Sequence, residues 1–325
     1  MKKFLLIILL LNPIYILAKD VILGGDSLGI RIDYNGVLVS STYKYTIDNI
    51  SIDPNSIIDP DDIIVKCNNN SISSIKDFNN CISTYKSSIN NVPIVVKRNN
   101  KLVNLNFKYA YQQSSNSYIT GLYMSDYLEG IGTLTYLDPT DLSYGALGHI
   151  ASATSANLNF NTGNIFLSNV TGINRPTKNE PGEKKATIDH NSMIGNIKFN
   201  NIYGIYGHMD VLKDNKHIET ANNDQIHLGR ATIYSVLNDS TISEYQIEII
   251  KLDNQSKPDL KGIKFRVTDK RLLDASGGIV QGMSGSPIIQ DGLLIGAVTH
   301  VDNDDPTLAY GIYINWMLEQ DKILP

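Results

Sequence analysis

Short apolar runs, each ended by Asn, Asp, Gly or Pro, recur along the chain from residue 21 onward, and this pattern constrains the fold more than any other feature. Runs of this length and spacing predict β-strands. Helical spacing of apolar residues is confined to residues 74–87 and 314–321. We therefore predict a mainly β protein, with strands near residues 29–32, 36–40, 62–66, 92–96, 102–107, 130–136, 164–170, 192–199, 225–236, 245–250, 262–268 and 286–298.

The length of the chain, 325 residues, predicts about two domains. Residues 21–108 are expected to form a half-open β-barrel with one or two helices. Residues 119–325 are expected to form a barrel or sandwich of strands. Residues 109–118 contain a run of Gln, Ser and Asn, so we interpret them as a polar linker.

The first twenty residues predict an export signal or a helical membrane anchor. Two lysines precede an apolar run over residues 4–18, which is the pattern of a secretory signal. The run is shorter than the about 20 apolar residues that span a membrane. Cleavage after Ala18 would place the large Ile16 two residues before the cut, so removal and retention both stay open. In either case, the remaining residues are expected outside the cytoplasm.

The charge balance and the motifs exclude several classes of function. Lys and Arg total 28 against 33 for Asp and Glu, a net charge of −5, whereas a nucleic-acid-binding domain is basic and clusters its positive charge. The chain has no His-Glu-x-x-His motif, and the Asp-Asn-Asp-Asp stretch at residues 302–305 lacks the glycine and glutamate of a calcium loop. We expect no nucleic-acid partner, no metal and no cofactor.

Residues 282–287 read Gly-Met-Ser-Gly-Ser-Pro and place Ser284 between glycines, directly before an apolar strand that turns at an Asp-Gly pair. A serine on such a tight turn can expose its hydroxyl while the N–H groups of Gly282 and Ser284 converge on an oxyanion. The esterase pattern G-x-S-x-G is not met, because Ser286 occupies its last position. The string thus indicates a nucleophile with its oxyanion hole, although an ordinary turn before a hairpin also fits it.

A serine nucleophile needs a base, and the chain has six histidines. His149 follows a turn of small residues well upstream of Ser284, which favours it as the base; His208 is a second candidate. His300 ends the strand that returns beside the serine, so it is either a substrate-pocket residue or a plain strand-end residue. The other three lie in polar surroundings and are expected at the surface: His190, His217 and His227.

A longer pattern carries a family resemblance. It comprises GGIVQGMSGSPII at residues 277–289, GAVTHV at 296–301 and YGIYINWML at 310–318, together with GIGTLT at 130–135, YGALGH at 144–149 and PGEK at 181–184. Together these segments resemble the stage IV sporulation protein B family of serine peptidases, over most of residues 20–325.

The resemblance implies an N-terminal membrane segment over residues 1–20, a PDZ domain over 21–108 and, over 119–325, a peptidase domain built as a chymotrypsin-like double β-barrel. Within the PDZ domain, four residues would form the loop that binds a peptide, in cis or in trans, by strand addition: Ser27, Leu28, Gly29 and Ile30.

The resemblance also implies a catalytic triad of Ser284 as nucleophile, His149 as general base and Asp269 as carboxylate. Chymotrypsin-like enzymes carry this aspartate in the first barrel, whereas Asp269 lies fifteen residues before the serine. Other carboxylates therefore stay open as alternatives: Asp189, Asp210 and Asp274.

The implied function is that of an exported, membrane-associated serine endopeptidase. It would cleave itself and a membrane-associated regulatory protein in the space between the forespore and mother-cell membranes, and so activate a late sporulation sigma factor. The alternative is a catalytically inactive adaptor whose PDZ domain binds peptides. Export also permits a disulfide between Cys67 and Cys81, but Cys81 fits a buried helix face as a small apolar residue, so the pairing stays open.

Overall fold

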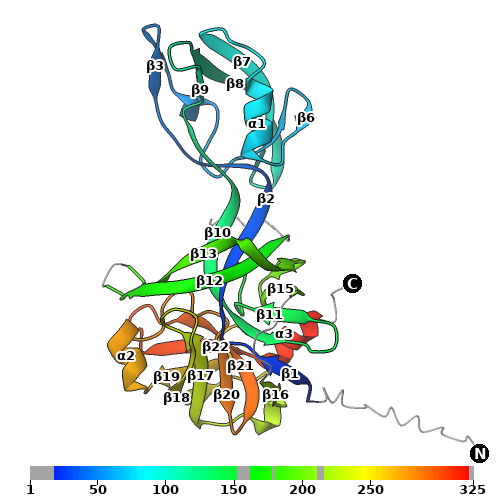
Figure 1. Cartoon of the computed structure of the whole chain (residues 1–325), viewed down its shortest axis with the longest axis vertical. Helices are drawn as coiled ribbons and strands as arrows, with labels where there is room; N and C mark the ends of the chain where they lie inside the picture. Colours follow the sequence, from blue (N-terminus) through cyan, green and yellow to red (C-terminus); the bar gives the residue numbers. More distant parts are fainter. Residues whose placement is uncertain (1–17, 152–161, 178–179, 211–215, 322–325) are drawn as a thin grey trace, which may run out of the picture.

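The computed structural model describes residues 18–151, 162–177, 180–210 and 216–321. Figure 1 shows a smaller N-terminal domain (residues 37–125) and a larger lower body (residues 20–30 and 130–321), which two long strands, β2 (Ser27–Thr42) and β10 (Leu122–Leu137), connect. The predicted signal or anchor falls mainly on residues 1–17, outside the described residues. Across the described ranges, no helix is both long and apolar enough to cross a membrane.

The N-terminal domain is a sheet in the order β10-β2-β5-β7-β8-β9 with one α-helix. Its helix α1 (Ile75–Ile82) begins at Ser74, whose hydroxyl accepts a hydrogen bond from the Asp77 N–H, and buries Phe78 and Ile82 against the sheet. The remaining elements are β3 (Tyr45–Ile47), β4 (Ile50–Ile52), the 3-10 helix η1 (Pro54–Ser56), β5 (Ile63–Cys67), β6 (Asn70–Ser71), β7 (Ile89–Arg98), β8 (Lys101–Gln112) and β9 (Ser117–Ile119).

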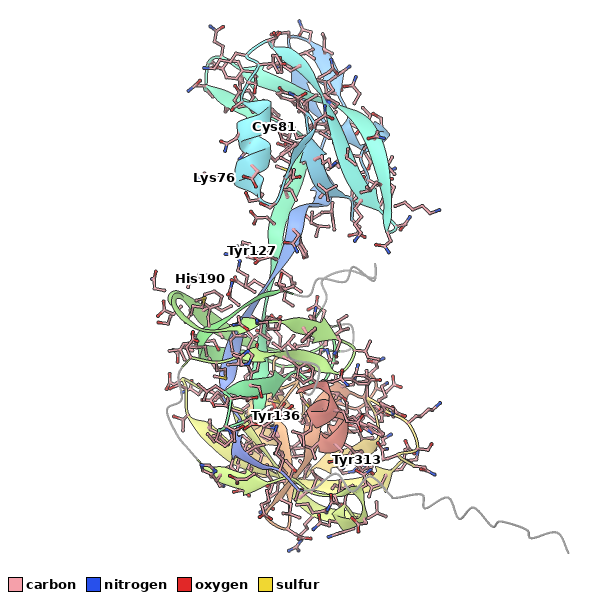
Figure 2. All side chains as sticks on the ribbon, turned by 90° about the vertical axis from the view of Figure 1, so that its right-hand side faces the viewer. Lys76, Cys81, Tyr127, Tyr136, His190 and Tyr313 are labelled. Atoms are coloured by element: carbon pink, nitrogen blue, oxygen red, sulfur yellow. A yellow bond between two sulfur atoms is a disulfide. The ribbon has the colours of Figure 1, made fainter. Side chains whose placement is uncertain are left out.

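A disulfide joins Cys67 at the end of β5 to Cys81 in α1. The pairing that the sequence left open is therefore present, and it fixes the helix to the sheet beside the buried Phe78. Figure 2 shows Cys81 on the face of α1 that meets the strands.

Two predicted boundaries are wrong. Residues 109–118 are not a linker: they continue β8, turn and start β9, and Tyr109 is fully buried with its hydroxyl donating to the Ile82 carbonyl. Likewise, the N-terminal domain does not begin at residue 21, because β1 (Asp20–Leu23) and the first part of β2 belong to the lower body. Strand β2 runs from the lower body into the N-terminal domain. A domain boundary inside one continuous strand cannot be detected from changes in sequence composition.

The neck (residues 31–36 and 126–129) is the middle of the β2–β10 ribbon. The two strands pair from Leu122↔Thr42 to Thr133↔Ser27, with shifts of register between Tyr123 and Met124 and between Ser125 and Tyr127. The Arg31 guanidinium lies 4.0 Å from the centre of the Tyr127 ring, so a cation–π contact reinforces the ribbon where Figure 2 shows Tyr127.

In the first half of the lower body, strands lie in the order β15-β11-β10-β2-β12-β13. A bridge between Gly195 in β13 and Met209 after β15 joins the two ends of this row. The side chains inside form one core, which includes Ile30, Leu134 and Ile165. The strands are β11 (Ser143–Ala146), β12 (Gly163–Asn174), β13 (Glu183–Ile197), β14 (Phe199–Asn201), β15 (Gly204–His208) and β16 (His217–Glu219).

The second half of the lower body is a closed barrel in the order β17-β18-β19-β22-β21-β20. The predicted hairpin at Asp291-Gly292 is confirmed, since both residues have positive φ, as such turns require. The elements are η2 (Asn223–Gln225), β17 (Gly229–Val236), β18 (Ile242–Leu252), β19 (Ile263–Val267), α2 (Lys270–Ser276), β20 (Pro287–Gln290), β21 (Leu293–Val301), β22 (Leu308–Tyr313) and α3 (Ile314–Asp321). The mainly β prediction is therefore confirmed.

Replacement of Cys67 and Cys81 by alanine should destabilise the N-terminal domain. The two cysteines are 14 residues apart, and closing a loop of about 15 residues stabilises a fold by about 3 kcal/mol. We expect a lower urea midpoint, measured by circular dichroism on the double variant and on reduced wild-type protein. Equal midpoints for oxidised wild type and the double variant would contradict the stabilising role.

Candidate active site

Residues 282–287, the serine loop, end the connection from α2 and enter β20 at Pro287, and they approach β10 closely. Gly282 and Gly285 have φ values of +90° and +92°, in the region that favours glycine. A Cβ at Gly285 would lie 2.0 Å from the Thr133 carbonyl oxygen and 2.5 Å from the Leu147 nitrogen. Glycine is therefore required at position 285 for two reasons: the positive φ, and the close approach of Thr133 and Leu147 from the first half of the lower body.

Two threonines of β10 hold the serine loop. The Thr133 N–H donates to the Ser284 carbonyl at 2.9 Å, and the Thr133 hydroxyl donates to the Gly282 carbonyl at 2.8 Å. The Thr135 hydroxyl donates to the Gly285 carbonyl at 2.8 Å. Both threonines are fully buried, so these bonds are shielded from water and fix the loop of the second half to a strand of the first.

The predicted oxyanion donors, Gly282 and Ser284, are oriented by their neighbours. In a trans peptide, the C=O and the following N–H point in opposite directions. The Gln281 carbonyl accepts from the Lys184 N–H, and the Met283 carbonyl accepts from the Ser286 N–H, so both peptides are held. Within the described residues, the N–H groups of Gly282 and Ser284 donate to no protein acceptor, which leaves them available to a ligand.

His149 follows β11 after a turn in which Leu147 and Gly148 have φ values of +70° and +69°. Its Nδ1 lies 2.8 Å from the Ile150 carbonyl oxygen. Because a carbonyl can only accept, Nδ1 carries the proton and Nε2 of the neutral ring is the proton acceptor. Burial lowers the pKa of His149, which favours this neutral form.

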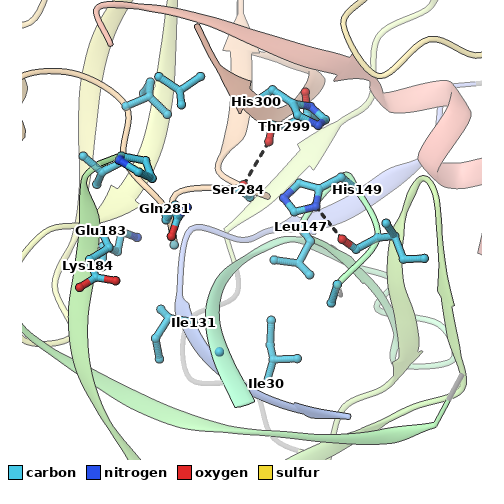
Figure 3. A pocket seen from close by; sticks show the side chains of 18 of the residues that line it. Ile30, Ile131, Leu147, His149, Glu183, Lys184, Gln281, Ser284, Thr299 and His300 are labelled. Atoms are coloured by element: carbon cyan, nitrogen blue, oxygen red, sulfur yellow. Dashed lines mark hydrogen bonds between the residues drawn. The ribbon is translucent and has the colours of Figure 1, made fainter. Parts of the chain in front are cut away.

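Ser284 and His149 line the same pocket of about 690 Å³, between the two halves of the lower body (Figure 3). The Ser284 hydroxyl donates to the Thr299 carbonyl at 3.1 Å. Its bond to Thr299 must therefore open before the hydroxyl can donate to His149. Apolar walls come from both halves, including Ile30, Leu147 and Val280.

The model of the family described as SpoIVB peptidase S55 matches residues 116–318. The chain belongs to this family. It is a serine endopeptidase, and its substrate is protein. No curated protein matches the chain.

In this SpoIVB-family peptidase, Asp269 caps helix α2 and does not line the serine pocket. Its two carboxylate oxygens accept from the Arg271 N–H and guanidinium and from the Gln246 N–H. The bonds from Arg271 lower the pKa of Asp269 to about 2. Among the described residues, no hydrogen bond joins Asp269 to His149, so the structure does not bring the three predicted triad residues together.

The alternative carboxylates lie elsewhere. Asp189 accepts from Ser192 and the Asn191 N–H at an exposed, irregular part of β13, and Asp274 pairs with Lys270 on the surface of α2. Asp210 follows Met209 at the edge of the first half, where its N–H donates to the Ile194 carbonyl. The Ile150 carbonyl thus holds the ring nitrogen that a triad carboxylate would hold.

His300 lies in the same pocket. Its ring centre is 5.4 Å from that of His149, and its buried Nδ1 has no hydrogen-bond partner among the described residues. Burial, with a smaller contribution from His149, lowers the pKa of His300 to about 4. His208 pairs with Ser143 through the strands β15 and β11 and does not line the pocket described above. The other three histidines are exposed, as predicted, beside Glu129, Asp20 and Asp291 respectively: His190, His217 and His227.

Sequence reasoning missed Lys184 and Thr133. Lys184 lies in the pocket wall and Thr133 beneath the serine loop, and both belong to segments quoted for the family resemblance, PGEK and GIGTLT. The two motifs indicated the family. The roles of Lys184 and Thr133 could not be predicted from them, because these roles depend on contacts with the serine loop, which lies about 100 to 150 residues away in the chain.

The structure corrects the peptide-binding assignment of Ser27, Leu28, Gly29 and Ile30. They start β2 inside the lower body, paired on one side with residues 130–133 of β10; on the other side, residues 28–30 pair with residues 165–167 of β12. Strand addition needs a free edge, and Leu28–Ile30 has none. Within the described residues, no group of three or more His, Cys, Asp or Glu side chains could hold a metal ion.

Replacement of Gly285 by alanine should abolish hydrolysis. The added methyl group would force the serine loop away from β10, so we expect at least about a 100-fold lower kcat on fluorescein-labelled casein, comparable to the loss of an oxyanion donor. Gly292→Ala is the matched control, because Gly292 also has a positive φ but open space at its Cβ. A Gly285→Ala enzyme with the wild-type rate would refute the required loop position.

Replacement of Asp269 by asparagine should leave kcat within about threefold of wild type while lowering stability by about 1 kcal/mol, because asparagine can still cap α2 but loses the charge-assisted bonds to the Arg271 guanidinium. Because the folded pKa is depressed to about 2, its stabilisation is present above the unfolded pKa and is lost as pH falls from about 4 to about 2. Casein hydrolysis and urea unfolding at pH 7 and pH 3 measure both effects. A loss of activity as large as that of Ser284→Ala would instead favour a triad role.

Proposed function

We propose that Ser284 and His149 carry out peptide-bond hydrolysis. The observation that supports this most strongly is their presence in one pocket between the two halves, beside two N–H groups that have no other acceptor among the described residues. Ser284 is supplied by the second half and His149 by the first, so the site depends on the contact between them.

In the proposed reaction, His149 Nε2 takes the proton of the Ser284 hydroxyl as Oγ attacks the peptide carbonyl carbon. The N–H groups of Gly282 and Ser284 bind the resulting oxyanion. The imidazolium then gives its proton to the leaving amine, and water hydrolyses the acyl-enzyme by the same steps in reverse. The Ile150 carbonyl holds the tautomer throughout, and Asp269 contributes to the stability of α2.

The arrangement of the lower body supports a chymotrypsin-like relation between its halves, since a site between two strand barrels is the hallmark of that fold. The N-terminal domain, a sheet with one packed helix, is the PDZ-like unit of this proposal. Its peptide, in cis or in trans, would bind outside Ser27–Ile30.

The biological part of the proposal extends the family resemblance. The peptidase is exported through its N-terminal segment, stays associated with a membrane, cleaves itself and then cleaves a membrane-associated regulatory protein between the forespore and mother-cell membranes. That cleavage activates a late sporulation sigma factor. The disulfide of the N-terminal domain supports export, because disulfides persist in oxidising compartments.

Replacement of Ser284 by alanine should abolish casein hydrolysis, fluorophosphonate labelling and self-cleavage, because the nucleophilic oxygen is removed. Intact-mass spectrometry should find a shortened N-terminus in the wild type and not in the variant, and circular dichroism checks that both are folded. Ser192→Ala, at a half-buried position that does not line the pocket described above, serves as the control. An active alanine variant would refute the proposed nucleophile, and a folded wild type that fluorophosphonate leaves unlabelled would favour the peptide-binding adaptor.

A further inference from the structure

Lys184, near the start of β13, is a buried lysine beneath the serine loop. Only 5% of its surface is exposed. Its Nζ lies 3.0 Å from the Ser235 hydroxyl in β17 and 3.4 Å from the Thr133 hydroxyl in β10. The ammonium therefore contacts strands of both halves of the lower body, and Figure 3 shows Lys184 at the side of the pocket, near Gln281.

Both hydroxyls lead to the serine loop. The Thr133 hydroxyl donates to the Gly282 carbonyl at 2.8 Å, and the Ser286 hydroxyl donates to Ser235 at 3.0 Å. All three hydroxyl residues are fully buried. Lys184 is thus one hydrogen bond removed from each end of the segment that carries Ser284.

The main chain of Lys184 acts on the same loop. Its N–H donates to the Gln281 carbonyl at 2.9 Å, and the Gln281 N–H donates to the Gly182 carbonyl at 2.8 Å. These bonds fix the peptide whose other end is the Gly282 N–H, the first proposed oxyanion donor. The stem of Lys184 also packs against Gly282, where an added Cβ would lie 3.1 Å from the Lys184 Cβ.

No carboxylate neutralises this lysine among the described residues. None of the ion pairs they form includes Lys184, and the adjacent Glu183 carboxylate accepts from the Asn174 amide instead. The other titratable groups of the shared pocket are Glu129, His149 and His300. A buried ammonium without a counterion leaves a net positive charge near any group that binds in the pocket.

We propose that Lys184 is a positioning residue of the peptidase, which orders the serine loop from below and adds positive charge beneath the oxyanion hole. This inference rests on the proposed roles of Gly282 and Ser284. It assigns Lys184 no proton transfer to substrate. Its effect is on the transition state, where negative charge develops, and so on kcat more than on KM.

Burial lowers the pKa of Lys184 to about 7. The ammonium is therefore present below about pH 7 and is lost as the pH rises through this value. His149, whose pKa is lowered from its ordinary value, is already neutral over this range. Wild-type kcat should accordingly fall above about pH 7 through the loss of the Lys184 charge.

The test compares Lys184→Met with wild type in the full-length, detergent-solubilised chain, using fluorescein-labelled casein from pH 5.5 to 9. We expect a kcat about 10- to 100-fold lower at pH 6, a KM within about twofold, and no alkaline decline in the variant. Lys185→Met is the matched control, because this neighbouring lysine is exposed, and it should behave as wild type.

Ser235→Ala provides a second variant that removes one partner of Nζ, and we expect a kcat about 3- to 10-fold lower. If circular dichroism shows that Lys184→Met is unfolded, the kcat of Ser235→Ala becomes the test of the proposal. The proposal would be overturned if folded Lys184→Met and Ser235→Ala enzymes had the same kcat and the same pH profile as the wild type. A wild-type rate that rises through pH 7, and no longer does so in Lys184→Met, would also overturn it by indicating a general base. An active Ser284→Ala enzyme would instead show that the proposed nucleophile is wrong, which is a different outcome from the failure of the Lys184 proposal.

Discussion

The contact between Thr133 and the serine loop is the interaction on which the rest of the site depends. Two bonds from this one residue, from its N–H to Ser284 and from its hydroxyl to Gly282, hold the loop of the second half against β10 of the first. Without them, the loop would be an ordinary turn before a hairpin. With them, the carbonyls of Gly282 and Ser284 are occupied, while the N–H groups of these two residues have no acceptor among the described residues, which is the condition for binding an oxyanion at no reorganisation cost.

Much of the architecture could be predicted from the sequence, because local patterns determine it. The strands, the helix after Ser74 and the Asp291-Gly292 turn follow from periodicity and turn chemistry, and the glycines around Ser284 indicated a loop of special conformation. The errors concern what local patterns do not encode. The polar run at residues 109–118 is a hairpin of the N-terminal domain, and Ser27–Ile30, which read as a loop, is a strand paired along both edges over residues 28–30.

Electrostatics explain why the carboxylate was the least predictable part of the site. An aspartate fifteen residues before the serine is close in sequence, but its position is decided by helix capping and by Arg271, both of which satisfy its oxygens locally. A carbonyl that follows His149 directly in the chain can hold the imidazole without any charge. The pocket around His149 and His300 is consequently one in which burial favours neutral imidazoles. Lys184, whose side chain packs against the loop, has no ion-pair partner among the described residues.

The same strand that holds the serine loop also carries the N-terminal domain. β10 pairs with residues 38–42 of β2 inside that domain and with residues 27–33 below it, and the shifts of register lie at the upper end, around Tyr123 to Tyr127. Bulges are where a two-stranded ribbon bends most readily. From Tyr127↔Asp33 to Thr133↔Ser27 the pairing is unbroken, and Arg31 packs on Tyr127 at the start of this stretch. Bending of the ribbon is thus concentrated at the upper end of the neck and above it, so the geometry at Thr133 is set by the lower body and not by the orientation of the domain that β10 carries.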